Sequence, residues 1–336
     1  MPIIQSISRF LQKIQIPFNT VSYIGRQQKF LKKHIVPKIS AALQMADSSL
    51  DEQDIKKING YYGLAVPAIL GEAFCVLRGQ AMTDKERLCS SSQGAMTGLG
   101  DDFFDRQRLS EQGVKDFIER PEQFSGNSAT EKLFLDLYKT ALANAPQATQ
   151  MQEQLYLVFY AQLLSRQQDV PGLSYEVIKD ITIRKGAESL LYYRTAFEHP
   201  LKTNEQNMLY SLGGLMQLSN DIFDVYKDLQ AGVSTMVTTT ASIRQLRFHY
   251  AALLEISTAM AYRSGYPKEN TRKFLGVLHM GIFSRCYVCL DQLQKLEKRS
   301  GGIFEPKAYS RKDLVCDMDT PGNKLRSARY MMKLLE

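Results

Sequence analysis

Apolar residues recur at steps of three and four along most of the chain, which is the period of an amphipathic α-helix. Residues that favour helices, such as Leu, Ala, Gln, Lys and Glu, are frequent in these stretches. The pattern predicts helices over 27–45, 51–78, 83–108, 111–119, 129–144, 150–168, 174–198, 204–230, 240–264, 268–297 and 324–335. Proline and glycine separate them. Only 234–240 has a β-like composition, and one strand cannot form a sheet, so an all-α fold is predicted.

The predicted helices follow one another without a low-complexity linker. We therefore expect one large helical domain over 46–336, preceded by a basic helical segment over 1–45. No uninterrupted apolar run reaches the roughly 20 residues of a membrane span, because the longest, 63–77, contains Pro67 and Glu72. The five cysteines make a disulfide framework unlikely in a chain that also lacks a secretory apolar region. A cytoplasmic location is predicted.

The net charge of +7 comes from the first 45 residues, which contain seven basic residues and neither Asp nor Glu. The remainder is balanced, with 35 basic and 35 acidic residues. Two interpretations stay open: the segment contacts an anionic membrane or ligand, or it is the solvated face of a first helix. Nucleic-acid binding is not expected, because it would require a basic surface across the fold.

The segment GDDFFD at 100–105 closes an apolar helical run. On a helix Asp101 and Asp105 lie about 40° apart, one turn from each other. Two carboxylates placed in this way repel each other unless a cation lies between them. A ligand set made only of oxygen suits Mg²⁺ rather than zinc. This segment is the first candidate metal site.

A second acidic segment contains Asn220, Asp224 and Asp228 at four-residue steps, with Lys227 beside them. These side chains share one helix face and again offer only oxygen ligands for a metal. Carboxylates at this spacing usually form a solvated surface. Two such clusters, each within an apolar helix, instead suggest a socket in which metal ions bridge a diphosphate.

Residues 101–105 match the aspartate-rich DDxxD motif of class I isoprenoid synthases, and 213–228 resembles their second metal motif. The resemblance implies a helical bundle with a central apolar cavity and three Mg²⁺ ions. Asp101 and Asp105 would bind two ions with support from Asp102. Asn220, Asp224 and Asp228 would hold the third ion. Asp224 and Asp228 stand where terpene synthases have Ser or Thr and Glu.

Two further segments resemble the cationic groups that this family uses to hold the leaving diphosphate. Arg184-Lys185-Gly186 is similar to a helix that carries a diphosphate-sensing Arg or Lys and is broken at a small residue, and either side chain is a candidate. Arg329-Tyr330 is similar to the pair that closes over the diphosphate. A solvated basic pair and a chance Arg-Tyr dipeptide are the alternatives.

A carbocation formed in such a site needs an apolar cage with aromatic faces. The residues expected to contact the substrate lie near the two motifs or after the Arg-Lys-Gly segment; ordinary core packing is the alternative for the aromatics, and close helix packing is the alternative for the glycine of the first helix. They are Thr97, Gly98, Phe104, Tyr193, Gly213, Met216 and Lys227.

A chain-elongating prenyltransferase also binds a second diphosphate through basic residues, but 60–67 contains neither Lys nor Arg. After Asp105 the chain has Arg106-Gln107-Arg108 in place of an Arg pair. We therefore predict a class I terpene synthase, a lyase that ionises an allylic prenyl diphosphate with Mg²⁺ and lets the cation cyclise or eliminate. A trans-prenyltransferase and a non-catalytic prenyl-lipid-binding protein are the alternatives. A homodimer and a membrane contact through residues 1–45 are the partner hypotheses.

Overall fold

The computed structural model describes the backbone of residues 2–45, 47–107 and 110–334, and the side chains of 15–45, 47–100 and 110–334. Helices make up 79% of the chain, and these ranges contain no β-strand. The predicted all-α class is therefore confirmed. Two helices, α7 (Glu111–Glu119) and α8 (Ala129–Asn144), occupy the predicted ranges. The isoprenoid synthase arrangement of the helices stays a prediction.

Contacts between residues divide the chain into two compact units. Unit 1 contains Met1–Ile16, Val158–Leu191 and Leu201–Glu336, and unit 2 contains Pro17–Leu157 and Tyr192–Pro200. The chain passes between the units within α1 (Pro2–His34), α9 (Ala148–Ser165) and α10 (Tyr175–Arg194). This division does not coincide with the boundary expected after residue 45, and the single domain over 46–336 stays a prediction.

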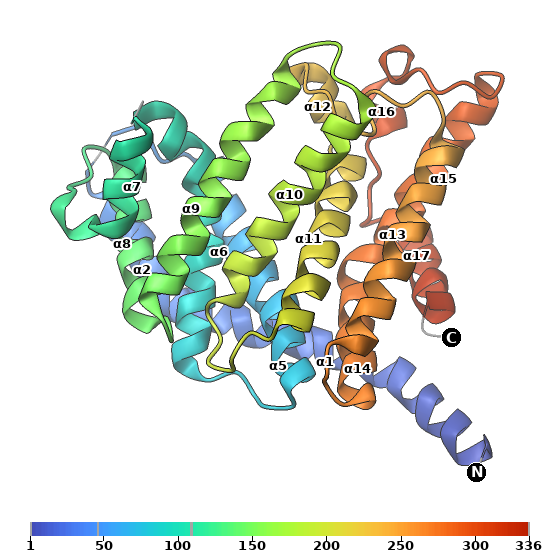
Figure 1. Ribbon diagram of the computed structural model, residues 1–336, viewed down its shortest axis with the longest axis horizontal. Coiled ribbons are helices and arrows are strands. Elements are labelled where there is room, and N and C mark those ends of the chain that lie inside the picture. Colours follow the sequence, from blue (N-terminus) through green and yellow to red (C-terminus); the bar gives the residue numbers. More distant parts are fainter. Residues whose placement is uncertain (1, 46, 108–109, 335–336) are drawn as a thin grey trace. The chain divides into compact units, whose positions relative to one another are not determined.

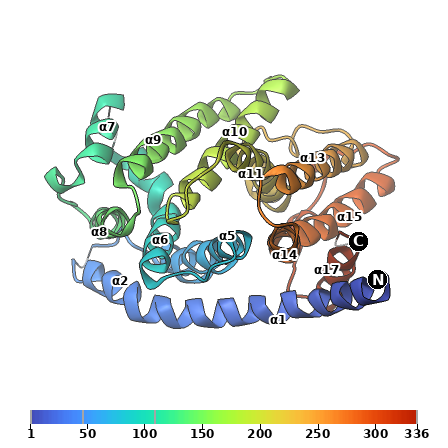
Figure 2. The same cartoon turned by 60° about the horizontal axis from the view of Figure 1, so that its bottom comes forward.

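In unit 2, α6 lies beside α8, as Figures 1 and 2 show. Besides α7 and α8, the unit contains α2 (Val36–Leu43), α3 (Glu52–Lys56), α4 (Gly63–Ala65), α5 (Glu72–Arg78), α6 (Asp84–Gln107), wide π-helical turns η1 (Lys57–Tyr62) and η2 (Val66–Gly71), and the 3₁₀ turn η3 (Pro121–Gln123). Gly94 lets α6 approach η1 closely, because a Cβ there would lie 2.4 Å from the Tyr62 carbonyl oxygen. This close contact positions α6, the helix that carries the first acidic segment, against η1.

The end of α10 is anchored to α6 within unit 2. The Gln93 side-chain amide donates to the Tyr192 carbonyl oxygen at 2.8 Å, and the Glu198 backbone N–H donates to the Glu86 carboxylate at 3.0 Å. Burial would raise the pKa of Glu86, but hydrogen bonds, first of all from Arg78, lower it to about 2. These bonds hold the segment around Tyr193 against α6.

In unit 1, α11 (Thr203–Phe223) packs against α13 (Ile243–Arg263) and α15 (Ser284–Arg299), and Figure 1 shows α11 beside α13. Large apolar side chains of α11, such as Leu209, Leu212 and Leu215, are fully buried. The remaining elements are η4 (Arg166–Asp169), α12 (Val225–Ala231), α14 (Lys268–Leu278), η5 (His279–Phe283), η6 (Pro306–Ala308), α16 (Arg311–Leu314) and α17 (Pro321–Leu334).

The crossing of α10 and α11 is closed by two glycines. A Cβ at Gly186 would lie 2.1 Å from the Gly213 carbonyl oxygen, and a Cβ at Gly213 would lie 2.4 Å from the Gly186 carbonyl oxygen. Both clashes are with backbone, which cannot move aside as a flexible side chain can. α10 continues through Gly186 without the break found in the family helix that its sequence resembles. Gly186 here permits close helix packing.

Two helical stretches among the described residues are long and apolar enough to span a membrane, Glu52–Arg78 and Lys268–Arg299. Charged residues interrupt both stretches, and Pro67 also interrupts the first, so neither is the uninterrupted apolar run that a membrane span was expected to need. Core helices of soluble proteins can have the same length and composition, and 56% and 72% of the apolar parts of the two stretches are buried inside the fold. The two stretches are weak grounds for a membrane protein, and the cytoplasmic location stays a prediction.

We predict that Gly186→Ala destabilises the protein by about 1–3 kcal/mol, because the new methyl group overpacks a backbone contact. Urea unfolding followed by circular dichroism measures this free energy. Gly25→Ala is the matched control, because Gly25 lies in α1 with nothing within 4 Å of the added Cβ. The control should keep or raise the free energy of unfolding, by up to about 1 kcal/mol. Equal unfolding midpoints for Gly186→Ala and the wild type would contradict the tight crossing.

Candidate functional site

The second acidic segment lies where α11 ends and α12 begins. Asp224 separates the two helices, with φ −89° and ψ 8°. Its N–H donates to the Asn220 carbonyl oxygen at 2.8 Å, and the Asp228 N–H donates to the Asp224 carbonyl oxygen at 2.9 Å. Helical spacing thus continues through the junction. The Asn220 side-chain amide donates to Asp224 Oδ2 at 3.4 Å, so the structure brings these two predicted ligands together.

Asp221 is the most buried carboxylate of this region, with 5% of its surface exposed. Gln217 Nε2 donates to Asp221 Oδ1 at 2.9 Å, and Thr182 Oγ1 on α10 donates to Asp221 Oδ2 at 3.4 Å. Burial raises the pKa of Asp221 to about 6, although the hydrogen bond from Gln217 and the charge of Lys185 oppose this shift. Asp221 therefore joins α10 to α11, and it directly follows the predicted ligand Asn220 in the chain.

Asp228 is half-buried and shares the electrostatic field of its neighbours. Burial, followed by the charges of Asp221 and Asp224, raises the pKa of Asp228 to about 7. Lys227 and Lys185 act in the opposite direction, but they do not balance these effects. At Asp228, burial and neighbouring negative charge together therefore outweigh the two lysines. A divalent cation would relieve this repulsion, and the donor set of carboxylate and amide oxygens suits Mg²⁺.

The two candidate cations on α10 have different surroundings. The Lys185 charge lowers the pKa of both Asp221 and Asp228, so it acts on the acidic junction. The Arg184 guanidinium lies 5.4 Å from the centre of the Tyr160 ring. Lys227 has 80% of its side chain exposed, and its ammonium lies 3.8 Å from Asp224 Oδ2. Lys185 is therefore the better placed of the α10 pair to contribute charge at this site.

The Tyr330 hydroxyl on α17 donates to both carboxylate oxygens of Asp291 at 2.8 Å and accepts from Arg247 at 2.8 Å. Its ring stacks on Tyr287 at 5.1 Å between centroids. The adjacent Arg329 is exposed, and both residues line a surface hollow of about 500 Å³. Tyr330 is thus held in a polar network with α13 and α15, and closure of this pair over a diphosphate stays a prediction.

In unit 2 the fold brings two predicted substrate-contacting residues together. The Tyr193 hydroxyl donates to Thr97 Oγ1 at 3.1 Å, and Thr97 Oγ1 donates to the Gln93 carbonyl oxygen at 2.8 Å. A Cβ on Gly98 would lie 3.3 Å from the Tyr62 ring, so this glycine makes room for a neighbouring side chain. The substrate roles of Thr97, Gly98 and Tyr193 stay predictions.

The first acidic segment falls on the last turns of α6. The side chains of Asp101, Asp102, Phe104 and Asp105 lie outside the described residues. Among the side chains that are described, no three His, Cys, Asp or Glu groups are gathered so that they could hold a metal ion. The meeting of the two acidic segments and the three Mg²⁺ ions stay predictions.

Two other predicted substrate contacts lie on α11. Gly213 is buried in the crossing with α10, where its lack of a side chain is used for packing. Met216 is partly exposed one turn before Asn220. Neither position shows a substrate role by itself, and both roles stay predictions.

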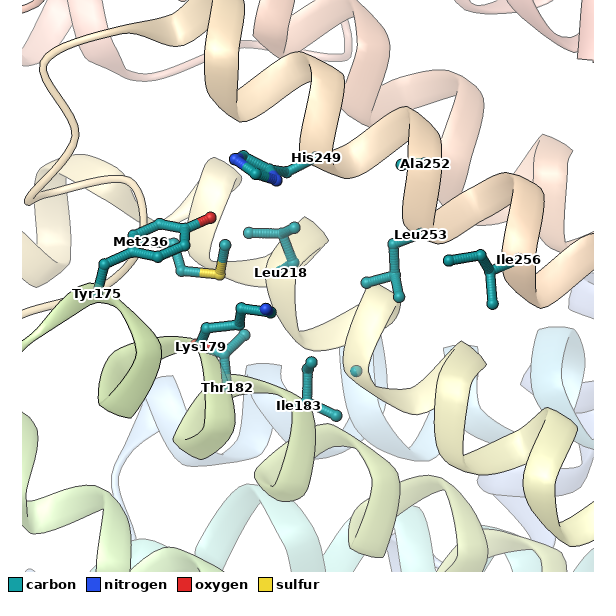
Figure 3. Close-up of a pocket in the computed structure, with 11 residues that line it drawn as sticks. Tyr175, Lys179, Thr182, Ile183, Leu218, Met236, His249, Ala252, Leu253 and Ile256 are labelled. Carbon is teal, nitrogen blue, oxygen red and sulfur yellow. The ribbon is translucent and has the colours of Figure 1, made fainter.

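A pocket of about 170 Å³ lies between α10, α11 and α13 (Figure 3). Tyr175 and His249 lie toward one end of it, and Leu253 and Ile256 toward the other. Thr182 lines this pocket and also bonds to Asp221. A cavity of similar size, about 150 Å³, accepts benzene. The pocket is thus too small to enclose a whole prenyl chain, and the central apolar cavity stays a prediction.

The sequence pattern did not single out Asp221 and Thr182 as partners. Asp221 follows Asn220 directly, so it lies about 100° around the helix from the face that the four-residue repeat defines. Its partner Thr182 is 39 residues away on another helix. The only sequence signal was the position of Thr182 three residues before Lys185, on the same face of α10.

No protein-family model, curated protein sequence or solved structure matches this chain. The resemblance to isoprenoid synthases therefore rests on the two motifs and on the chemistry of the α11–α12 junction.

We predict that the two raised carboxyl pKa values make the protein less stable as pH rises. The ordinary pKa of Asp is 3.8, whereas Asp221 and Asp228 have folded pKa values of about 6 and about 7. Between the unfolded and folded pKa values, the folded state therefore holds more protons than the unfolded state. The contribution of the two aspartates to the free energy of unfolding falls from about pH 4 to about pH 7. Above that range the loss is complete.

Asp228→Asn should reduce this dependence, which urea unfolding at a series of pH values measures. Asp180→Asn is the matched control, because Asp180 is exposed on α10. The control should retain the wild-type profile. A profile for Asp228→Asn that superimposes on that of the wild type would contradict the electrostatic coupling at the junction.

Proposed function

We propose that the protein is a class I terpene synthase that ionises an allylic prenyl diphosphate and releases a cyclised or eliminated hydrocarbon, or a water-quenched alcohol. The observation that carries the proposal is the acidic α11–α12 junction, where the Asn220 amide donates to Asp224 and the charges of Asp221 and Asp224 act on the half-buried Asp228. Burial and mutual repulsion raise two of their pKa values, and a divalent cation would lower both. Such a site suits a ligand that brings metal ions with it, as a Mg²⁺ diphosphate does.

The ligand roles are those that the resemblance to isoprenoid synthases implies, and the oxygen donors of the two segments suit them. Asn220, Asp224 and Asp228 would hold one Mg²⁺ ion at the α11–α12 junction. Asp101 and Asp105 of α6, with support from Asp102, would hold two more. When bound, Mg²⁺ would neutralise charge on the diphosphate oxygens and so make the diphosphate a better leaving group.

The chain's own groups would assist the same step. The bond between the allylic carbon and the diphosphate oxygen breaks, and both electrons leave with the diphosphate. Lys185 would donate to the diphosphate oxygens as their charge grows, an interaction strongest after the bond has broken. Loss of a proton from the remaining cation, directly or after ring closure, would complete the reaction. Arg184, Arg329 and Tyr330 are further candidates for holding the anion.

We predict that the purified protein converts a prenyl diphosphate of ten, fifteen, twenty or twenty-five carbons, with Mg²⁺, to a hydrocarbon or alcohol. Gas chromatography with mass spectrometry identifies the product, and phosphate release gives the rate. Asp101→Asn and Asp224→Asn should each lower kcat/KM at least about a hundredfold, the scale of losing one group that stabilises developing charge. Asp180→Asn should retain the wild-type rate.

The same assay separates the alternatives. Strict dependence on isopentenyl diphosphate, with a longer diphosphate as product, would indicate a trans-prenyltransferase. A protein that Mg²⁺ and diphosphate do not stabilise against heat, and that releases no product from any substrate, would be a non-catalytic prenyl-lipid-binding protein. Equal rates for wild type and Asp224→Asn would contradict the assigned site.

A further inference from the structure

The first long helix has an exposed face on which large apolar and basic side chains lie together. Phe18 and Val21 have 76% and 66% of their surface exposed, and Lys29, Lys32 and Lys33 are exposed two to four turns further along α1. Viewed down the helix axis, Lys29 and Lys32 lie about 20° and about 40° from Phe18, on opposite sides of it. Val21 and Lys33 lie about 60° from Phe18, again on opposite sides. The five side chains therefore form one stripe.

The opposite face of α1 fixes this orientation. Leu31 is buried, as is Ile35 just beyond the end of the helix, and Gln27 is fully buried. The Gln27 side-chain amide donates to the Gly63 carbonyl oxygen at 3.0 Å and to Ser91 Oγ at 2.8 Å. Rotation that buried Phe18 would break these bonds and expose the apolar side. The stripe must therefore stay on the outside of unit 2.

Charge distinguishes this stripe from an ordinary solvated helix face. The first 45 residues contain no Asp or Glu, and they carry the whole net charge of the chain. An exposed apolar stripe elsewhere, with Phe248 and Ile256 on α13, has the exposed Glu255 next to it in the chain. By contrast, α1 contains no acidic residue, so every charged side chain that shares the face of Phe18 and Val21 is a cation.

We propose that this stripe of α1, from Phe18 to Lys33, binds the surface of an anionic lipid bilayer. Aromatic and aliphatic side chains insert at the boundary between headgroups and acyl chains, while lysines contact lipid phosphate and carboxylate groups. Gly25 lies between the two halves of the stripe and has no side chain to keep the helix away from the surface. The inference uses α1 alone and does not depend on the proposed function.

Flotation of the full-length protein with lipid vesicles tests this proposal. One set of vesicles contains only phosphatidylcholine, and the other contains about one third phosphatidylserine. The wild type should float with the anionic vesicles at about 0.1 M salt, should be released at about 1 M salt, and should not bind the neutral vesicles. Circular dichroism confirms that each variant keeps its helical content.

Two variants separate the components of the stripe. Lys29→Gln/Lys32→Gln/Lys33→Gln should weaken vesicle binding at least about tenfold. The control Lys85→Gln/Lys132→Gln/Lys139→Gln removes the same charge from other exposed positions of unit 2. It should change vesicle binding less than about twofold. Phe18→Ser/Val21→Ser should also weaken binding, and Phe248→Ser/Ile256→Ser should not.

Three results would overturn the proposal. The first is a wild type that does not float with anionic vesicles at low salt. The second is equal loss of binding in the stripe variant and its charge-matched control, which would indicate a general effect of net charge. The third is a wild type that binds a fluorescent oligonucleotide but does not bind the vesicles, which would indicate that the basic face binds a nucleic acid.

Discussion

The close crossing of α10 and α11 at Gly186 and Gly213 is the contact on which the candidate site depends. Backbone touches backbone at this point, so the two helices approach more closely than any larger side chain would permit. That approach puts Thr182 within hydrogen-bonding distance of Asp221. It also brings the Lys185 charge to the acidic junction. A wider crossing would leave Asp221 buried with fewer partners.

The acidic junction is costly to the fold. Burial and like charge raise the pKa of Asp221 and Asp228, which means that ionising them in the folded protein opposes stability. An apolar side chain at either position would remove this cost. Strongly shifted carboxyl groups of this kind are frequent at functional sites, where a bound cation or substrate compensates for the repulsion. The proposed Mg²⁺ diphosphate ligand would provide that compensation.

Sequence patterns predicted most helices because their apolar period and their breakers are local features, but the predicted helix over 27–45 was wrong, since α1 spans Pro2–His34 and α2 spans Val36–Leu43. The four-residue repeat likewise anticipated the contact of Asn220 with Asp224, because helical geometry alone places them together. The burial of Asp221 and its bond to Thr182 depend on how two helices cross, which no local pattern contains. The pattern also did not predict the interruption between α11 and α12 at Asp224, because the backbone hydrogen bonds keep helical spacing on both sides of this residue. The sequence was interpreted as a helix break at Gly186, whereas in the structure this glycine permits close packing of α10 against α11.

The central claim is that the acidic α11–α12 junction of unit 1 binds a Mg²⁺ diphosphate. A double-mutant cycle measured by calorimetry tests this claim, with inorganic diphosphate and Mg²⁺ as the ligand and with Asp224→Asn, Asp228→Asn and the double variant as proteins. A shared ligand predicts weaker binding in each single variant and a coupling free energy above about 0.5 kcal/mol. Wild-type affinity in either single variant, or losses that add within about 0.3 kcal/mol, would contradict the claim.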